Sequence, residues 1–179
     1  MAKPKRVPAP THEYTAESSD LEASALAFAL KADQPVLLWG PPGTGKTSVI
    51  TEVAAKMSAV LETLIGSTID PTDLARPVLG EDGEVRLSAA PWARRLRQAL
   101  DEGKEAILFM DELSTSPPAV QAALLRVAQE RRVGEIDLTG CRVIAAANPI
   151  DQSAGGWDLA APMANRWLHL DWRLSPEKW

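Results

Sequence analysis

Apolar residues gather in five short runs, separated by segments whose apolar positions recur at helical spacing. The runs cover residues 35–39, 59–65, 106–110, 141–147 and 167–172. Several of them are apolar at nearly every position, which is typical of strands that are covered on both faces. We therefore predict five strands, several of them buried on both sides.

The segments between these runs follow the 3.6-residue period of helices. Helices are predicted from about residue 19 to 32, over 46–57, from Pro91 to about Leu100, and from Pro117 or Pro118 to about Val127. Alternating strands and helices predict an α/β fold with a parallel sheet. Segments 77–88 and 131–140 break the alternation, and we predict that both are inserted hairpins, the first turning at Asp82-Gly83.

Length and composition fit one domain behind a tail. Residues 1–18 carry three prolines and few large apolar residues, so we expect a flexible tail before a single domain over 19–179. The formal charge of −5 argues against a surface dedicated to nucleic acid. Cys141 is the single cysteine and cannot form an internal disulfide. Because no apolar run approaches the roughly 20 residues of a membrane helix, we expect a soluble, cytoplasmic protein without a membrane partner.

The sequence GPPGTGKT at 40–47 matches the P-loop pattern G-x-x-x-x-G-K-[ST] between a predicted strand and a predicted helix. Amides of such a loop wrap phosphate oxygens, and the following helix turns its positive N-terminus toward the same charge. Lys46 would reach the β- and γ-phosphates, and the Thr47 hydroxyl would bind Mg²⁺. The candidate nucleotide-binding residues are Pro42, Gly43, Thr44, Gly45, Lys46, Thr47 and Ser48. The plainer alternative is a glycine- and proline-rich turn that happens to contain a lysine.

Three further residues carry candidate chemistry at strand ends. The strand at 106–110 delivers Asp111 and Glu112 to its carboxyl end, where ligands bind in open α/β sheets. Asp111 would hold Mg²⁺, and Glu112 would polarise the attacking water as general base. Asn148 ends the next predicted strand and would orient that water or touch the γ-phosphate. The alternatives are a solvated strand end for the acidic pair and an Asn-Pro turn for Asn148.

A family resemblance extends this interpretation. The motifs GPPGTGKT, LFMDE, AAANP and LAAPMANRW (159–167) occur in the order found in AAA+ ATPases, and segments 108–133 and 146–167 closely resemble the MoxR branch. The resemblance covers residues 35–172. It implies a P-loop NTPase three-layer sandwich whose five-stranded parallel sheet has the order 5-1-4-3-2. It also implies a hairpin inserted in the second helix, which 77–88 matches, and a pre-sensor hairpin, which 131–140 matches.

The same resemblance assigns two more residues. Asn148 looks like the sensor 1 residue. Arg166 looks like the arginine finger, which acts on the nucleotide of a neighbouring subunit. Many members have Asp-Arg-Phe where Asn165-Arg166-Trp167 stands, so the arginine and the aromatic bulk are kept. Taken from the residue alone, Arg166 is equally a surface arginine or a partner of a helix dipole. The candidate catalytic residues are Lys46, Glu112, Asn148 and Arg166, and the candidate metal ligands are Thr47 and Asp111.

MoxR-type membership implies Mg²⁺-dependent hydrolysis of ATP in a ring, usually a hexamer. Hydrolysis would drive chaperone-like remodelling of a protein client, often with a partner that bears a von Willebrand A domain. The family also has a helical lid after the last core strand. The chain ends at Trp179, seven residues past that strand, so we expect an ATPase core without the lid.

Other hypotheses stay open from the sequence. One is a DNA-associated AAA+ motor or a McrB-like restriction component, although the acidic charge speaks against nucleic acid. Arg94, Arg95 and Arg97 form a short basic run that is either a solvated helix face or a contact with DNA or a subunit. Another is a stand-alone P-loop kinase that phosphorylates a small molecule. Arg131 or Arg132 is an alternative second cation acting in trans.

Overall fold

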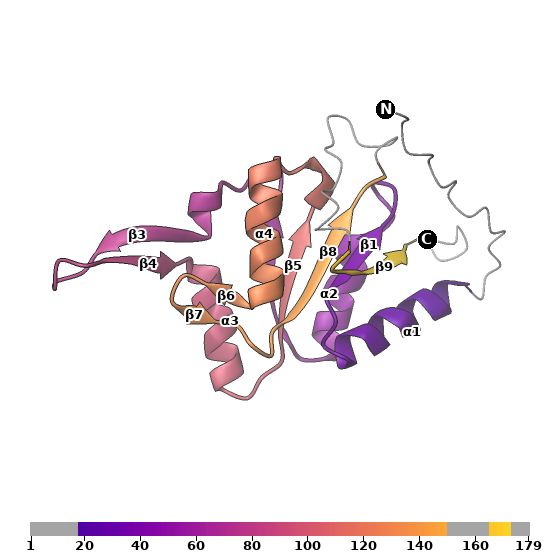
Figure 1. The fold of residues 1–179 in the computed structure, drawn as a ribbon. Coiled ribbons are helices and arrows are strands. Elements are labelled where there is room, and N and C mark those ends of the chain that lie inside the picture. The colour runs from indigo at the N-terminus through magenta and orange to yellow at the C-terminus, as the bar shows by residue number, and fades with distance from the viewer. Residues whose placement is uncertain (1–17, 150–164, 173–179) are drawn as a thin grey trace, which may run out of the picture.

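The computed structural model describes residues 18–149 and 165–172, which form three layers with a parallel sheet between two pairs of helices (Figure 1). The helices are α1 (Ser18–Lys31), α2 (Lys46–Lys56), α3 (Pro91–Asp101) and α4 (Pro118–Glu130), with short 3-10 helices η1 (Pro71–Asp73) and η2 (Leu113–Thr115). The sheet contains β1 (Val36–Trp39), β2 (Val60–Ile65), β5 (Ala106–Asp111), β8 (Arg142–Ala147) and β9 (Leu168–Asp171). The four predicted helices and five predicted strands are confirmed to within a few residues. The predicted tail lies outside the described residues except for Ser18, which begins α1.

The sheet has the order β9-β1-β8-β5-β2, and every pairing in it is parallel. Counted along the chain, these are its fifth, first, fourth, third and second strands, so the predicted order is confirmed. The inner strands are buried at almost every position, whereas the edge strands β2 and β9 are partly exposed. This difference explains why the inner strands have the more uniformly apolar sequences.

Alternate residues of each inner strand enter two separate hydrophobic clusters. In β5, Leu108 and Met110 join the cluster formed with α3 and α4, whereas Ile107 and Phe109 join the cluster formed with α1 and α2. Successive side chains of a strand point to opposite faces, so a strand covered on both sides must be apolar at every position. Both faces of the sheet are therefore packed against helices. The loops that leave its carboxyl edge start from this packed framework.

Two hairpins interrupt this framework, as predicted. The first pairs β3 (Ala75–Leu79) with β4 (Val85–Ala89) and extends well away from the body of the molecule (Figure 1). The second pairs β6 (Arg132–Val133) with β7 (Ile136–Asp137). Glu135 joins the two hairpins, because its backbone N–H donates to the Leu87 carbonyl (3.2 Å) and its carboxylate accepts from the Ala89 N–H (2.8 Å).

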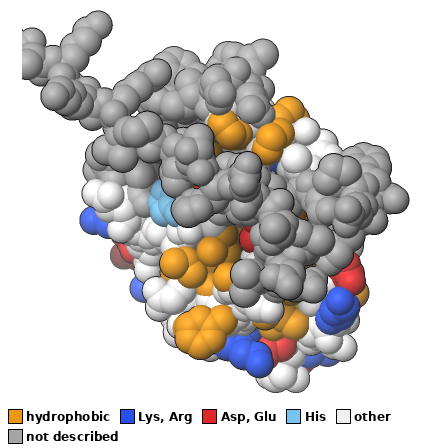
Figure 2. Space-filling model, turned by 90° about the vertical axis from the view of Figure 1, so that its right-hand side faces the viewer, with side chains coloured by type: hydrophobic (Ala, Val, Ile, Leu, Met, Phe, Trp, Pro, Cys, Tyr) orange, Lys and Arg blue, Asp and Glu red, His pale blue; other side chains and the backbone are white. Residues whose placement is uncertain are grey.

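Within the described residues, no helix is both long enough and apolar enough to cross a bilayer. Hydrophobic side chains do reach the surface beside charged ones on the side seen in Figure 2. The Cys141 thiol is buried, and burial raises its pKa to about 12, so it is protonated and unreactive at neutral pH.

Candidate active site

The P-loop connects β1 to α2 at the carboxyl edge of the sheet. Gly43 (φ 78°) and Gly45 (φ 73°) adopt the left-handed conformation that glycine enters at little cost. Left-handed residues in a tight loop turn successive amides toward one side and form an anion-binding concavity. The helix α2 begins at Lys46, directly after Gly45, so its positive end lies against the same concavity. Of the other predicted nucleotide-binding residues, Pro42 and Ser48 are exposed and Thr44 is partly buried.

Lys46 joins this loop to the end of β8. Its ammonium donates to the carbonyls of Gly40 (2.6 Å) and Pro41 (2.9 Å) and to Oδ1 of Asn148 (3.0 Å). The side chain is buried, and this burial lowers the pKa of Lys46, while the nearby negative charge of Asp111 opposes the shift. All three acceptors of the ammonium are oxygens, so a phosphate oxygen is a chemically equivalent partner.

Thr47, the residue after Lys46, contacts Asp111. The Thr47 hydroxyl donates to Oδ2 of Asp111 across 2.8 Å, joining the first turn of α2 to the end of β5. A carboxylate and a hydroxyl are hard oxygen ligands of the kind that Mg²⁺ uses, with phosphates and waters completing its octahedron. Among the described residues, no three His, Cys, Asp or Glu side chains cluster as a self-sufficient metal site. The residues present therefore fit a magnesium ion that is shared with a bound phosphate.

Glu112 lies beside this pair in a strained backbone conformation. Its φ of 55° is left-handed, which is uncommon for a residue that carries a side chain. Oε2 of Glu112 accepts a hydrogen bond from the Ser67 hydroxyl, which follows the neighbouring strand β2. Strain of this kind persists only where the surroundings impose it, and it concentrates at functional sites. The carboxylate of Glu112 is thus held at the carboxyl edge rather than left free.

Ser67 and Ser114 are site residues that the motifs did not reveal. The Asn148 N–H donates to the hydroxyl of Ser114 (3.0 Å), which is buried in η2. Ser67 carries a detectable signal only when the sheet order is used: the second and third strands are neighbours, so the residues after them meet at one edge. For Ser114 the sequence holds no comparable signal, because its position depends on the turn taken after Glu112.

Arg166 lies at the opposite edge of the sheet. It precedes β9, whose first residue Leu168 pairs with Val36 at the start of β1. The four residues of β9, at about 3.3 Å each, separate the two edges by about 13 Å. The Arg166 side chain is exposed and lies against Gln129 at the end of α4. With the amide of Gln129 turned so that its oxygen faces the guanidinium, Nε donates across 2.6 Å. The fold therefore brings Lys46, Asn148, Thr47, Asp111 and Glu112 together and leaves Arg166 apart.

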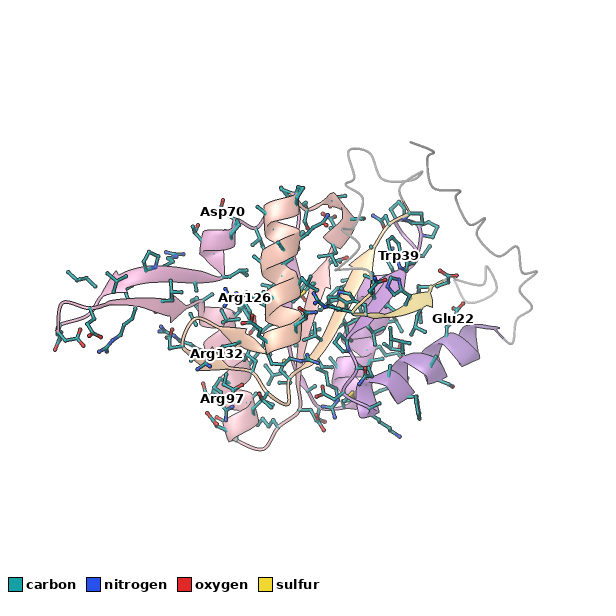
Figure 3. All side chains as sticks on the ribbon, in the orientation of Figure 1. Glu22, Trp39, Asp70, Arg97, Arg126 and Arg132 are labelled. Atoms are coloured by element: carbon teal, nitrogen blue, oxygen red, sulfur yellow. The ribbon has the colours of Figure 1, made fainter. Side chains whose placement is uncertain are left out.

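The neighbouring cations of this edge differ in their exposure. Arg131 is largely enclosed; it donates to the Cys141 carbonyl (2.8 Å) and pairs with Asp33, and burial lowers its pKa. Arg131 thus ties α4 to the start of β8 and is not available as a second cation acting in trans. Arg132 is exposed on β6, on the side of the molecule that carries the two hairpins (Figure 3).

Comparisons with known proteins match the chain to a domain family. The AAA domain family (dynein-related subfamily) matches residues 35–166. Protein NorQ of Paracoccus denitrificans (strain Pd 1222) is 31% identical over 126 residues, which are 70% of this chain and 44% of NorQ. The Holliday junction branch migration complex subunit RuvB of Methanoregula boonei is 31% identical over 139 residues, covering 69% of this chain and 36% of RuvB.

Solved structures share the fold. A mutant of RuvB from Thermotoga maritima superposes with a TM-score of 0.57 at 20% identity, over 90% of this chain and 47% of that one. This chain spans less than half the length of each of these three relatives. The family match covers most of the chain and includes both the P-loop and the acidic strand end. The chain belongs to the AAA domain family, dynein-related subfamily, and is a MoxR-type member of the AAA+ ATPases, a family of ATP-hydrolysing enzymes.

Proposed function

We propose that this chain binds ATP with Mg²⁺ at the carboxyl edge of its sheet and hydrolyses the γ-phosphoanhydride. The observation that carries the proposal is the convergence of three segments on the start of α2. Lys46 bonds to Asn148 after β8, and Thr47 bonds to Asp111 at the end of β5. An anion-binding loop, an ammonium, a carboxylate and an amide thus occupy one edge, which is the set that phosphoryl transfer requires.

Each of these side chains has a distinct task in the proposed reaction. The ammonium of Lys46 binds the β- and γ-phosphate oxygens and offsets the charge that grows on them in the transition state. Thr47 and Asp111 would hold Mg²⁺, which neutralises phosphate charge when it is bound. Glu112 accepts the proton of the attacking water, and Asn148 orients that water or the γ-phosphate. The contact with Ser67 keeps Glu112 in one rotamer, so the proton acceptor is already positioned when ATP binds.

The proposed reaction also needs a second copy of the chain. Arg166 cannot reach the P-loop of its own chain across the length of β9, but an exposed arginine at the opposite edge is suited to act on a neighbour's nucleotide. An arginine supplied in this way is worth about 10³–10⁵ in rate. We therefore propose head-to-tail self-association into a closed ring, with a hexamer as the expected size.

Remodelling of a protein client is the proposed use of the reaction. The β3–β4 hairpin exposes Leu79, Val85 and Leu87, and a two-stranded hairpin with an uncovered apolar face is marginal in water. These side chains support contact with a protein partner, such as a client or a von Willebrand A domain. Moving that hairpin is the proposed mechanical output of ATP turnover.

The direct test is release of inorganic phosphate from Mg-ATP, measured as a function of protein concentration. Hydrolysis to ADP and free phosphate is expected, with a specific activity that rises with concentration because the site is shared between subunits. Transfer of the phosphate to an added small-molecule acceptor in place of water would identify a kinase. Turnover that is unchanged by dilution would argue against the shared site.

A second candidate, a DNA-associated motor, is favoured by the similarity to RuvB, which is named as a subunit of a Holliday junction branch migration complex. The arginine run on α3 does not strengthen it, because Arg95 pairs with Glu62, Arg97 pairs with Asp101, and Arg94 contacts Glu135. Duplex DNA is the discriminating addition to the assay. Strong stimulation that falls steeply with salt would support the second candidate, because DNA binding releases counterions.

A further inference from the structure

Trp172 connects the end of β9 to the middle of the P-loop. Its indole N–H donates to the Thr44 carbonyl across 3.2 Å, and its backbone N–H donates to the Trp39 carbonyl at 2.5 Å. The side chain is buried in the cluster formed with α1 and α2. Trp172 is therefore held by the core and by β1, and it contacts the P-loop from this position.

The start of the P-loop is shaped to admit this contact. A Cβ atom added at Gly40 would overlap the carbonyl oxygen of Trp172 and would also press on the Thr44 hydroxyl. Only glycine lets β9 approach the loop so closely. The end of β9 thus lies against both Gly40 and Thr44: the glycine allows the close approach, and Thr44 accepts the hydrogen bond.

The hydrogen bond from Trp172 to the Thr44 carbonyl also affects the direction of the Gly45 N–H, which belongs to the same peptide unit. A peptide unit is planar and trans, so the Thr44 carbonyl and the Gly45 N–H point in opposite directions. Thr44 stands between two residues with left-handed φ, Gly43 and Gly45, where the peptide plane would otherwise rotate with little resistance. Fixing the carbonyl toward Trp172 fixes the Gly45 N–H away from it.

We propose that Trp172 is a positioning residue for nucleotide binding: it fixes the Thr44 carbonyl and thereby aims the Gly45 amide at a phosphate oxygen. The inference rests on the proposed function, because the phosphate is that of the bound nucleotide. Trp172 itself touches no phosphate and acts through the peptide between Thr44 and Gly45. The ligand concerned is any nucleoside phosphate in the loop, whereas a nucleoside without phosphate gains nothing from the contact.

Trp167 supplies a matched control at the other end of the same strand. It is buried to nearly the same degree as Trp172, but it packs on the cluster with α3 and α4. Its indole N–H is buried and finds no acceptor among the described residues. Trp172→Phe and Trp167→Phe therefore remove the same atoms from comparable surroundings, and only the first removes a hydrogen bond to the P-loop.

The test measures binding of ADP, and of adenosine, to the wild-type chain and both variants by calorimetry. Trp172→Phe is expected to weaken ADP binding by about three- to tenfold, the worth of one neutral hydrogen bond. It should leave adenosine binding unchanged, while Trp167→Phe changes neither. In turnover, KM for ATP rises in Trp172→Phe and kcat stays near the wild-type value. Equal losses in the two variants, or an equal loss for adenosine, would overturn the inference.

Hydrogen exchange separates this inference from the proposed function. Amides of segment 40–47 should exchange faster in Trp172→Phe than in Trp167→Phe without any nucleotide present. If the wild-type chain binds no ADP, the proposed function fails, and faster exchange in Trp172→Phe alone still establishes that the contact holds the loop. Unchanged exchange at 40–47 in Trp172→Phe would refute the positioning role directly. Gly40→Ala, which displaces the end of β9, should reproduce the faster exchange.

Discussion

The two edges of the central sheet are built differently. At the carboxyl edge, Lys46, Thr47, Asp111 and Asn148 are linked by hydrogen bonds of 2.8–3.0 Å, and these residues belong to separate segments of the chain. At the amino edge, Arg166 stands exposed beside Gln129. At the carboxyl edge the proposed site residues contact one another within a single chain, whereas at the amino edge the Arg166 side chain is exposed. In the proposed reaction, one chain therefore supplies the phosphate- and metal-binding groups, and assembly supplies the arginine.

The largest expected effect concerns the exposed edge. Arg166→Ala should lower turnover by about 10³–10⁵, because the cation that stabilises transition-state charge is removed. Binding of ATP to the isolated chain should be unchanged, since Arg166 lies a strand's length from the loop. Steady-state phosphate release and ATP affinity, measured together, check this. Arg126→Ala is the matched control, because Arg126 is exposed on α4 and pairs with Glu130 on the same helix.

Mixing decides whether Arg166 acts on a neighbour. Arg166→Ala chains and Lys46→Ala chains, each inactive alone, should regain part of the activity when combined, since some interfaces then hold an intact loop opposite an intact arginine. Absence of any recovery, although both variants still associate, would contradict the division of labour between the two edges.

The second effect concerns proton transfer at the carboxyl edge. Glu112→Gln keeps the shape of the side chain and removes the proton acceptor, so turnover should fall by about 10²–10⁴ while ATP binding is retained. Single-turnover measurements with pre-bound ATP isolate the chemical step. Glu130→Gln, an exposed glutamate on α4, serves as the control. Undiminished turnover in Glu112→Gln would remove Glu112 from the role of base.

The framework of this edge was predictable from the sequence, and its finer contacts were not. Runs such as 106–110 are apolar throughout because both faces of the strand are covered, so periodicity located the strands directly. The P-loop and the acidic strand end are motifs of consecutive residues, and such motifs can be recognised without knowledge of the fold. The contacts of Ser67 with Glu112 and of Trp172 with Thr44 join segments that follow neighbouring strands, and each contact is recognisable only after the strands have been placed side by side.

The third effect concerns affinity. Lys46→Met removes the ammonium that joins the loop to Asn148, and ATP should bind about 100-fold more weakly, near the upper range for hydrogen bonds to a charged group. Lys56→Met, at the other end of α2 and paired on the surface with Glu52, should bind normally. Equilibrium titration with a fluorescent nucleotide measures both.

The lowered pKa of Lys46 adds a pH test of the same group. The charged form binds phosphate, so affinity should decline with rising pH, beginning at a lower pH than an ordinary lysine would give. This decline should be absent in Lys46→Met. A pH profile that is identical in the wild-type chain and in Lys46→Met would show that the ammonium of Lys46 is not the group on which phosphate binding depends.

The smallest expected effect concerns how the Glu112 carboxylate is positioned at the carboxyl edge. The Ser67 hydroxyl donates to Oε2 of Glu112, and Ser67→Ala frees that carboxylate to sample other rotamers. Turnover should fall by about tenfold, the scale of one hydrogen bond to a charged group, with no change in ATP affinity. Thr68→Ala is the control next in the chain, because the Thr68 hydroxyl donates to the Ile65 carbonyl within its own turn. If Ser67→Ala and Thr68→Ala lose activity equally, the loss reflects the turn after β2, and Glu112 is positioned by its backbone alone.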